Sequence, residues 1–324
     1  RFLGNRANLM ALWNVQDRFK NPIDHNRPYG FEPQSTIKGK KNKYEHSSST
    51  IDYPATHITD KVYDNKKLKT PIEKEHAMLK GVVLDDATPA THKTEHNINY
   101  KDQIQEEADD ARWNKTDKTL KVKEKNGGID YTLPKSMTDK YKDLYFEIEL
   151  ELQSPDKPHR VKLNEFTQNR SSLGYSYRRV VNPLTIRIKA DDKVRLNLPK
   201  GNYRYKLKGV YGEDYQALKT ASRSVDRVKI KPTSHGYTFT KQPQDHGYLV
   251  IPTPYEKGMH ATIDGKEAEV KKGNGIETVI PVKKGQKHIQ LSYTPPYLYP
   301  LLILSGIGLI LAIGFTRFVR HKTK

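Results

Sequence analysis

Two short segments carry residue types that could do chemistry. The first is "HKTEH", from His92 to His96, which matches the H-x-x-E-H pattern of inverted zinc proteases. That chemistry requires both histidines on one face of a buried helix, with a third zinc ligand elsewhere in the chain. The neighbouring residues supply no apolar face on which such a helix could pack: Thr91, Lys93, Thr94, Asn97 and Asn99. We therefore expect a solvated loop here and predict no metal site.

The second segment is "GYSYRRV", residues 174–180. In a strand, Tyr175, Tyr177 and Arg179 would lie on one side and Arg178 on the other. Aromatic faces beside cations could bind a sugar or a phosphate. The alternative is that the tyrosines pack in a core while the arginines are solvated. The candidate ligand-binding residues are Tyr175, Tyr177, Arg178 and Arg179.

No other pattern in the sequence predicts an active site. The chain contains no P-loop, G-x-S-x-G segment or Rossmann fingerprint. It also lacks cysteine, which excludes a disulfide scaffold and any cysteine-ligated metal. Carboxylates are numerous, but their pairing cannot be read from sequence, so a glycosidase pair is neither predicted nor excluded. We predict no cofactor in this chain.

The chain is strongly basic, with a formal net charge of +19 over 324 residues. Arg317, Arg320, Lys322 and Lys324 follow Thr316 without an acid, which leaves +15 for residues 1–296. Such a body attracts polyanions, whether nucleic acid, anionic lipid or a phosphate-rich wall polymer. The lysines are interspersed with acids, so a solvated lysine-rich surface is the simpler explanation of any single cluster, and only the total charge indicates a polyanionic partner.

Strand signals dominate the second half of the chain. In "DLYFEIELEL" (143–152), apolar residues alternate with charged ones, which predicts a half-buried strand, and similar segments continue to Lys231. "ATIDGKEAEV" (261–270) contains Asp264-Gly265 between two alternating runs, which predicts a β-hairpin. Earlier, "TPIEKEHAMLK" (70–80) predicts a helix with Thr70 as its N-cap. The fold class is therefore mainly β.

The last segment predicts a membrane helix. Residues 298–315 are almost wholly aliphatic, and about 18 such residues suffice to cross the hydrocarbon core. Four basic residues follow the segment and none lies in the ten residues before it. The positive-inside rule therefore predicts that the C-terminus is cytoplasmic and that residues 1–296 are extracytoplasmic.

These signals divide the chain into five expected parts. They are a mixed, loop-rich region with a short helix near 71–80 (1–110), a β-sandwich or jelly-roll domain (111–232), a small β module with the Asp264-Gly265 hairpin (233–296), a transmembrane helix (297–317) and a basic cytoplasmic tail (318–324). Residues 86–110 are polar and are expected to form a linker or exposed loop. Because the first residues lack the pattern of a signal peptide, we expect earlier membrane helices in a longer protein.

Three segments resemble the YfhO family of bacterial polytopic membrane proteins. They are "LWNVQDRF…PYGFEP" (12–33), "TPIEKEHAMLKGVVLD" (70–85), and the stretch from "HGYLVIPTPYEKGMHATIDGKEAEVKKGNG" through "KKGQKHIQLSYTPP" into the final helix. The three segments occur in the order typical of the family and bracket nearly the whole chain. One departure is Met259, where a tryptophan is common after the Lys-Gly pair.

The resemblance implies a function. Proteins of this family are regarded as GT-C-type glycosyltransferases, which transfer a sugar from an undecaprenyl-phosphate carrier to teichoic acid, in particular lipoteichoic acid, outside the membrane. The resemblance also implies that an acidic residue in an early extracytoplasmic loop assists the acceptor hydroxyl. That loop would lie outside this chain, so we predict no catalytic residue here. The implied partners are the membrane, a polyanionic wall polymer as acceptor, the preceding membrane helices and an enzyme that loads the carrier lipid.

Two other functions remain open. One is a non-catalytic, membrane-anchored surface module that binds a wall polymer or glycan. The other is a tail-anchored cytoplasmic protein that binds nucleic acid. The sequence disfavours the latter, because it contains no recognisable nucleic-acid-binding fold and its charge is not concentrated on one element. We therefore predict no nucleic-acid partner.

Overall fold

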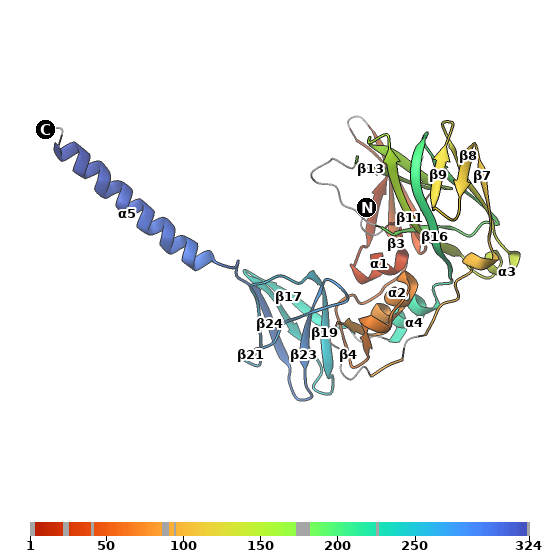
Figure 1. The fold of residues 1–324 in the computed structure, drawn as a ribbon. Helices are drawn as coiled ribbons and strands as arrows, with labels where there is room; N and C mark the ends of the chain where they lie inside the picture. The colour runs from red at the N-terminus through yellow and green to blue at the C-terminus, as the bar shows by residue number, and fades with distance from the viewer. Residues whose placement is uncertain are drawn as a thin grey trace. The chain divides into compact units, whose positions relative to one another are not determined.

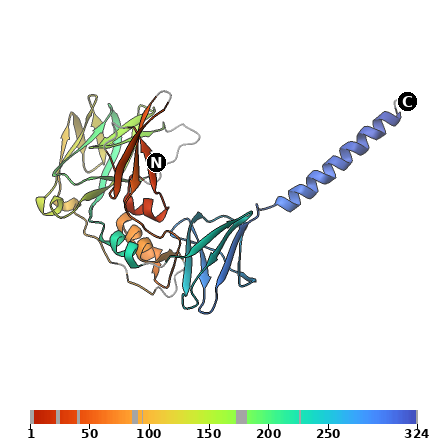
Figure 2. The same ribbon diagram turned by 180° about the vertical axis from the view of Figure 1, so that it is seen from behind.

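The computed structural model describes residues 4–21, 26–39, 42–85, 91–93, 95–172, 182–224 and 227–322. The described chain is mainly strand, as predicted, and divides into two compact units (Figures 1 and 2). Unit 1 comprises residues 1–55 and 61–225, and unit 2 comprises residues 56–60 and 226–324.

Unit 1 is built around a β-sandwich of two five-stranded sheets. The order of the first sheet is β13 (Phe166–Arg170), β12 (His159–Leu163), β15 (Lys193–Leu198), β10 (Gly127–Thr132) and β7 (Gln105–Asp109). The order of the second is β14 (Leu184–Lys189), β11 (Asp143–Ser154), β16 (Gly201–Glu213), β9 (Thr119–Val122) and β8 (Ala111–Asn114).

One apolar core lies between these two sheets. Alternate residues of β11, including Leu144 and Phe146, face alternate residues of β10 and β15, including Ile129 and Leu196. This arrangement follows from the alternation of apolar and polar residues, because successive side chains along a strand point to opposite faces of the sheet. The sandwich predicted from the alternating segments is therefore confirmed.

The other elements of unit 1 are smaller. A three-stranded sheet has the order β1 (Asp17–Lys20), β3 (Lys43–Ser49) and β2 (Phe31–Lys38), and β5 (Val62–Asp64) pairs in parallel with β6 (Val82–Leu84). The helices are α1 (Ala7–Leu12), α2 (Pro71–Lys80), α3 (Lys135–Thr138) and α4 (Gln216–Ser224), with short 3₁₀ turns η1 (Asn65–Lys67) and η2 (Lys101–Gln103). Figure 1 shows α1, α2 and α4 grouped together beside the sandwich. A shared apolar cluster, which includes Leu12, Leu79 and Leu218, joins the three helices.

Unit 2 contains a smaller sandwich. Its five-stranded sheet has the order β17 (Lys229–Thr233), β18 (Gly236–Thr240), β24 (His288–Tyr293), β20 (Met259–Ile263) and β21 (Lys266–Ala268). Its four-stranded sheet has the order β22 (Lys271–Gly273), β23 (Glu277–Val282), β19 (Gly247–Pro254) and β4 (His57–Thr59). The core between the sheets includes Phe239, Leu249, Ile263 and Ile280.

The expected hairpin is present in unit 2. Ile263 pairs with Lys266, and the two residues between them, Asp264 and Gly265, have φ angles of 49° and 80°. Positive φ at both central residues is the signature of a type I′ turn, which matches the right-handed twist of the flanking strands.

The segments differ from the sequence-based expectation in three places. Residues 229–232, expected at the end of the first β-sandwich domain, belong to β17, which pairs with β18 in unit 2. Residues 57–59, expected in the N-terminal region, form β4 of unit 2, where Ile58 pairs with Leu249 of β19. Residues 105–109, expected in a linker or loop, form β7, which pairs with β10 at the edge of the first sandwich. Both β4 and β7 are short and contain too few apolar residues to give a periodic signal.

The final helix, α5 (Leu298–Lys322), follows β24 after only four residues, 294–297. Its residues 298–319 have a mean hydropathy of 2.2 and none of that span is buried. The segment predicted to cross the membrane is thus a long, apolar helix that meets the length needed to cross a bilayer.

Candidate functional site

The candidate site of unit 1 starts from the capped helix α2. Thr70 Oγ1 accepts a hydrogen bond from the backbone N–H of Glu73 (3.1 Å), and Glu73 Oε2 accepts one from the backbone N–H of Thr70 (3.3 Å). This is the predicted capping box, with Pro71 at the first helical position. The cap fixes where α2 begins and places Glu75 and His76 in the next turn.

The second wall of the site is the outer face of sheet β14-β11-β16. Asp143 and Tyr145 of β11 pair with Glu213 and Tyr211 of β16. Because Leu144 and Phe146 point into the sandwich core, these four residues lie on the opposite face. That face is also buried, since Ile72 of α2 packs against Tyr145 and Tyr211. The half-buried strand predicted at 143–152 is therefore buried on both faces over its first residues.

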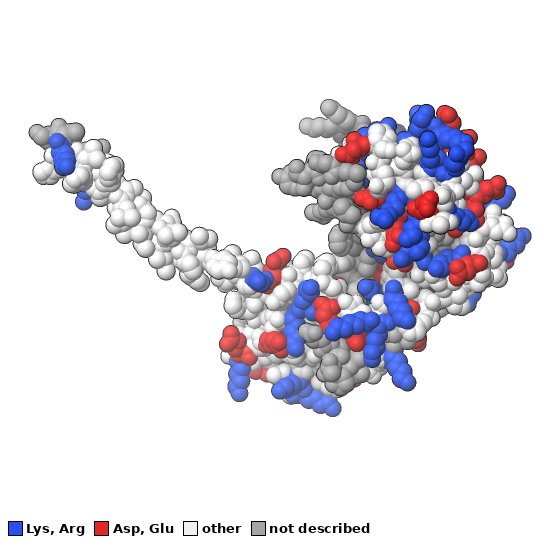
Figure 3. Space-filling view, in the orientation of Figure 1, with Lys and Arg blue, Asp and Glu red and all other residues white. Residues whose placement is uncertain are grey.

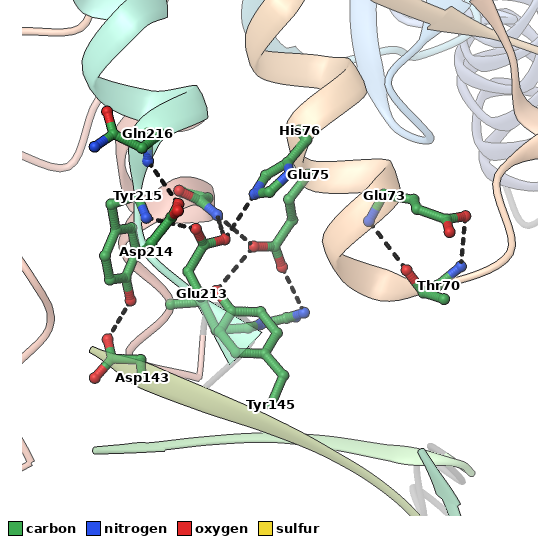
Figure 4. A network of polar contacts seen from close by, with 12 residues as sticks. Thr70, Glu73, Glu75, His76, Asp143, Tyr145, Glu213, Asp214, Tyr215 and Gln216 are labelled. Carbon is green, nitrogen blue, oxygen red and sulfur yellow. Dashed lines mark hydrogen bonds and ion pairs between the residues drawn. The ribbon is translucent and has the colours of Figure 1, made fainter. Parts of the chain in front are cut away.

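Two buried carboxylates meet between these walls (Figure 4). Asn8 Nδ2 donates to Glu75 Oε2 at 3.1 Å and to Glu213 Oε2 at 2.8 Å, so one amide joins both acids. Arg6 Nη1 contacts Glu75 Oε1 at 2.8 Å, and the Tyr145 hydroxyl donates to Glu75 Oε2 at 2.9 Å. Paired charges and hydrogen bonds are what permit such burial.

His76 connects this buried network to the surface. Its Nε2 lies 2.8 Å from Glu213 Oε2, and its side chain is 21% exposed while that of Glu213 is fully buried. Burial alone lowers the pKa of His76, but the hydrogen bond and negative charge of Glu213 outweigh it, so the pKa is raised above 6.5. Burial raises the pKa of Glu75, the Arg6 charge opposes that rise and the charge of Glu213 adds to it.

A second buried ion pair extends the network along the sheet. Arg187 Nη2 of β14 lies 2.5 Å from Asp143 Oδ1, and the Tyr215 hydroxyl donates a short hydrogen bond to the other oxygen of Asp143. Arg187 Nη1 also donates to Asn26 Oδ1 at 2.7 Å. These contacts tie the N-terminal segment to the sandwich.

A pocket of about 390 Å³ opens beside His76. Its walls come from α2, residues 92, 93 and 95–97, residues 140 and 141 after α3, and the start of α4. Polar and ionisable side chains dominate the lining, which includes Glu73, His76, Lys80, His92, Lys93, Glu95, His96, Asn97, Lys140, Tyr141, Asp214 and Gln216. The volume is within the range of small-ligand sites.

The charges around the pocket nearly balance before the histidines are counted. Three lysines and three carboxylates line it. Two of those carboxylates are already engaged: Glu95 pairs with Lys80 at 2.7 Å, and Glu73 accepts hydrogen bonds from the N–H groups of the α2 cap and of Asn97. Because the pKa of His76 is raised, its positive charge joins this lining at a higher pH than that of an ordinary histidine, with the Glu213 carboxylate behind it. An anionic or hydrogen-bonding ligand suits such a lining.

The "HKTEH" segment belongs to this pocket. His92, Lys93, Glu95 and His96 are exposed and non-helical, so the solvated loop expected there is confirmed for those residues. His96 Nδ1 lies 3.2 Å from Glu73 Oε1. In the described parts of the chain, no group of three His, Cys, Asp or Glu side chains is placed to hold a metal ion.

The sequence-predicted ligand residues Tyr175, Tyr177, Arg178 and Arg179 lie outside the described residues. Sequence reasoning missed His76, Glu213 and Asn8, which are separated by up to 205 positions in the chain. The only local signal was the capped helix itself, whose second turn carries the adjacent Glu75 and His76.

Comparison with known proteins identifies the family. The family model described as "Bacterial membrane protein YfhO" matches residues 1–305. A YfhO protein of Bacillus subtilis (strain 168) is 29% identical over 321 residues, which cover 97% of this chain and 37% of the relative. The chain thus spans little more than a third of that relative's length, and no solved structure matches it. The chain belongs to the YfhO family of bacterial membrane proteins.

Proposed function

We propose that this chain is the extracytoplasmic part of a membrane glycosyltransferase that transfers a sugar from undecaprenyl phosphate to lipoteichoic or teichoic acid. The catalytic residues would come from another part of the longer protein. In this arrangement the lipid-linked sugar is the donor substrate, and an enzyme that loads the carrier lipid is a partner.

The observation that carries the proposal is the four-residue connection between β24 and α5. A fully extended residue spans at most about 3.6 Å, so four residues keep unit 2 within roughly 15 Å of the helix start. A lipid-linked donor and a membrane-anchored acceptor both react at that surface.

The basic residues after the apolar span support the proposed side of the membrane. Figure 3 shows α5 as almost uncharged until the cations at its end. Arg317 and Lys322 lie in that last part of α5, and Asp and Glu are absent from it. The positive-inside rule favours a cytoplasmic end for α5 and an extracytoplasmic position for both sandwiches.

In this proposal the pocket beside His76 holds one phosphate-containing unit of the acceptor. The Lys93 and Lys140 side chains are exposed at the pocket, and the imidazolium of His76 is oriented by Glu213. A phosphodiester would be held by charge-assisted hydrogen bonds from these groups. The formal net charge of +15 on residues 1–296 would add a long-range, salt-sensitive attraction to the same polymer.

A non-catalytic module is the second candidate. Both units are β-sandwiches, an architecture shared by many cell-surface binding domains. Such a protein would use the same pocket and the same anchor, but it would bind the polymer without modifying it.

The test is sugar transfer by the full-length protein in nanodiscs. It is supplied with undecaprenyl-phosphate-linked, radiolabelled hexoses and purified lipoteichoic acid, and label in the polymer is counted. We expect transfer by the unaltered protein and a raised KM for lipoteichoic acid in the double variant K93Q/K140Q. The matched control is K284Q/K287Q, which removes the same charge from an exposed turn of unit 2.

The outcomes separate the two candidates. Pocket-dependent, salt-sensitive polymer binding without transfer of any hexose would favour the non-catalytic module. Equal effects of the two double variants would contradict the role given to the pocket. Absence of both transfer and binding would contradict both candidate functions.

A further inference from the structure

One end of the second sandwich is continuous with the start of α5. Tyr293 ends β24 and pairs with Met259 at the beginning of β20. The backbone N–H of Thr294 donates to the carbonyl of Gly258 at 2.9 Å, and that of Tyr293 donates to the carbonyl of His235 at 3.2 Å. The turn 234–235 and the connection 255–258 therefore lie at the same end as the first residue of α5.

A third turn lies at this end. Pro254 at the end of β19 pairs with Glu277, the first residue of β23. The backbone N–H of Tyr255 donates to the carbonyl of Ile276 at 2.8 Å, which fixes the turn 274–276 beside the connection 255–258. We call these three connections, together with residues 293–297, the helix-proximal end.

The helix-proximal end exposes large apolar and aromatic side chains. The exposed fractions are 41% for Tyr237, 39% for Ile276, 44% for Tyr293 and 77% for Tyr297. Tyr237 and Tyr293 continue the inward-facing rows of their strands, which are buried further along at Phe239 and Leu291. In a soluble sandwich these last positions of an inward row would be capped by a loop or by polar residues.

The opposite end of the same sandwich is different. It carries the turns Asp264-Gly265 and 283–286, and its exposed side chains include Asp264, Lys266, Lys283, Lys284 and Lys287. The helix-proximal end has charged residues too, Glu256 and Lys257, but they share it with the four apolar or aromatic groups. The two ends of one small sandwich therefore face different surroundings.

We infer that the helix-proximal end of unit 2 rests on the headgroup region of the bilayer that α5 spans, with Tyr237, Ile276, Tyr293 and Tyr297 in contact with lipid. Tyrosine suits this depth because its ring is apolar and its hydroxyl can stay hydrated. The occupant is lipid rather than a protein because this end is continuous with the membrane helix. The same contact is expected on whichever side of the membrane the unit lies, and whether or not sugar is transferred.

A buried acid at this end agrees with a lipid contact. Glu277 follows Ile276 directly, is 2% exposed and accepts a hydrogen bond from Asn274 Nδ2 at 2.7 Å. Burial raises its pKa to about 8, so it is mostly uncharged at neutral pH. The turn nearest the bilayer thus presents Ile276 without a negative charge behind it.

The absence of cysteine makes a direct test simple. The complete chain is reconstituted in phosphatidylglycerol–phosphatidylcholine nanodiscs with a single nitroxide label at I276C or at Y237C. The matched control is K284C, in an exposed turn at the opposite end. Paramagnetic relaxation by oxygen, which concentrates in lipid, is compared with relaxation by a water-soluble nickel chelate.

We expect the labels at 276 and 237 to show several-fold higher oxygen-to-nickel accessibility ratios than the label at 284. Equal ratios at all three positions would overturn the lipid contact. A label at 276 shielded from both reagents would mean that protein covers this end, which would also overturn it. In that case, spin–spin broadening that disappears on dilution with unlabelled chain would identify the cover as a second copy.

Discussion

His76 Nε2 lies 2.8 Å from Glu213 Oε2 and joins two elements that are 137 positions apart in the chain. His76 comes from the second turn of α2, and Glu213 is the last residue of β16. Because Glu213 is also held by Asn8, the contact fixes the N-terminal segment, α2 and the first sandwich together. The stability of unit 1 should therefore depend on the protonation of His76.

The first prediction concerns pH. The raised pKa of His76 means that the native state binds this proton more tightly than the unfolded state. The stabilisation is complete below pH 6.5 and is lost as the pH rises through the native pKa. Each ten-fold gain in proton affinity between the unfolded and the native state adds about 1.4 kcal/mol to the free energy of unfolding. In E213Q the effect of burial, which lowers the pKa of His76, is no longer outweighed by Glu213. The loss of stability with rising pH should therefore shrink or reverse.

Tryptophan fluorescence during urea unfolding measures this effect for unit 1 alone, because Trp13 and Trp113 both lie there. The control is E124Q, an exposed acid in the turn between β9 and β10. If the free energy of unfolding fell with pH equally steeply in E213Q and E124Q between pH 6 and 8, the pH dependence would not come from the contact of His76 with Glu213.

The second prediction concerns the buried pair of Asp143 and Arg187. Their side chains are 3% and 2% exposed, so D143A leaves a guanidinium buried without its counter-charge. We expect a loss of about 3–5 kcal/mol in the free energy of unfolding. The apolar double variant D143L/R187M should lose less than D143A, because it removes both charges.

The same fluorescence measurement checks this order of stabilities. If the double variant were destabilised by the sum of the two single losses, the two charges would be energetically independent and the pairing would carry no coupling energy.

The third prediction concerns Glu277 in unit 2. Its pKa of about 8 exceeds the unfolded value of 4.5, so the native state binds the extra proton between these pH values. Stability of unit 2 should therefore fall as the pH rises from 4.5 to about 8, by an amount on the order of a few kcal/mol, and change little above that range. E277Q cannot ionise and retains an acceptor for Asn274, so it should abolish the loss.

Hydrogen exchange of β23 amides, corrected for intrinsic rates, measures the local stability at pH 5 and pH 9. We expect E277Q to be more protected than the unaltered chain at pH 9 and similar to it at pH 5. E269Q, an exposed acid of the same unit, should match the unaltered chain at both. Identical protection of E277Q and the unaltered chain at pH 9 would contradict the raised pKa.

Local patterns in the sequence predicted much of the fold. Alternation in 143–152 indicated a strand, Asp264-Gly265 a hairpin and Thr70 to Glu73 a capped helix, and all three are present. Each depends on residues a few positions apart. Period-two alternation decides which face of a strand meets the core, and this is why the sandwich could be predicted before its strand order was known.

The site could not be predicted in the same way. The strand beginning at Asp143 was expected to be half-buried, yet Asp143 and Tyr145 are covered by α2 and the N-terminal segment. Their polar groups are tolerated because partners arrive from Asn8, Arg187 and Tyr215, all distant in sequence. A burial that depends on long-range partners leaves no periodic trace in the chain.

The most direct measurement is to locate unit 2 relative to the membrane. In the full-length protein with any other cysteines replaced, K284C in unit 2 and K322C at the end of α5 are labelled in intact cells with a membrane-impermeant maleimide. We predict labelling of K284C, and labelling of K322C only after the cells are opened. Labelling of K322C but not K284C in intact cells would place the sandwiches in the cytoplasm and contradict transfer to a wall polymer.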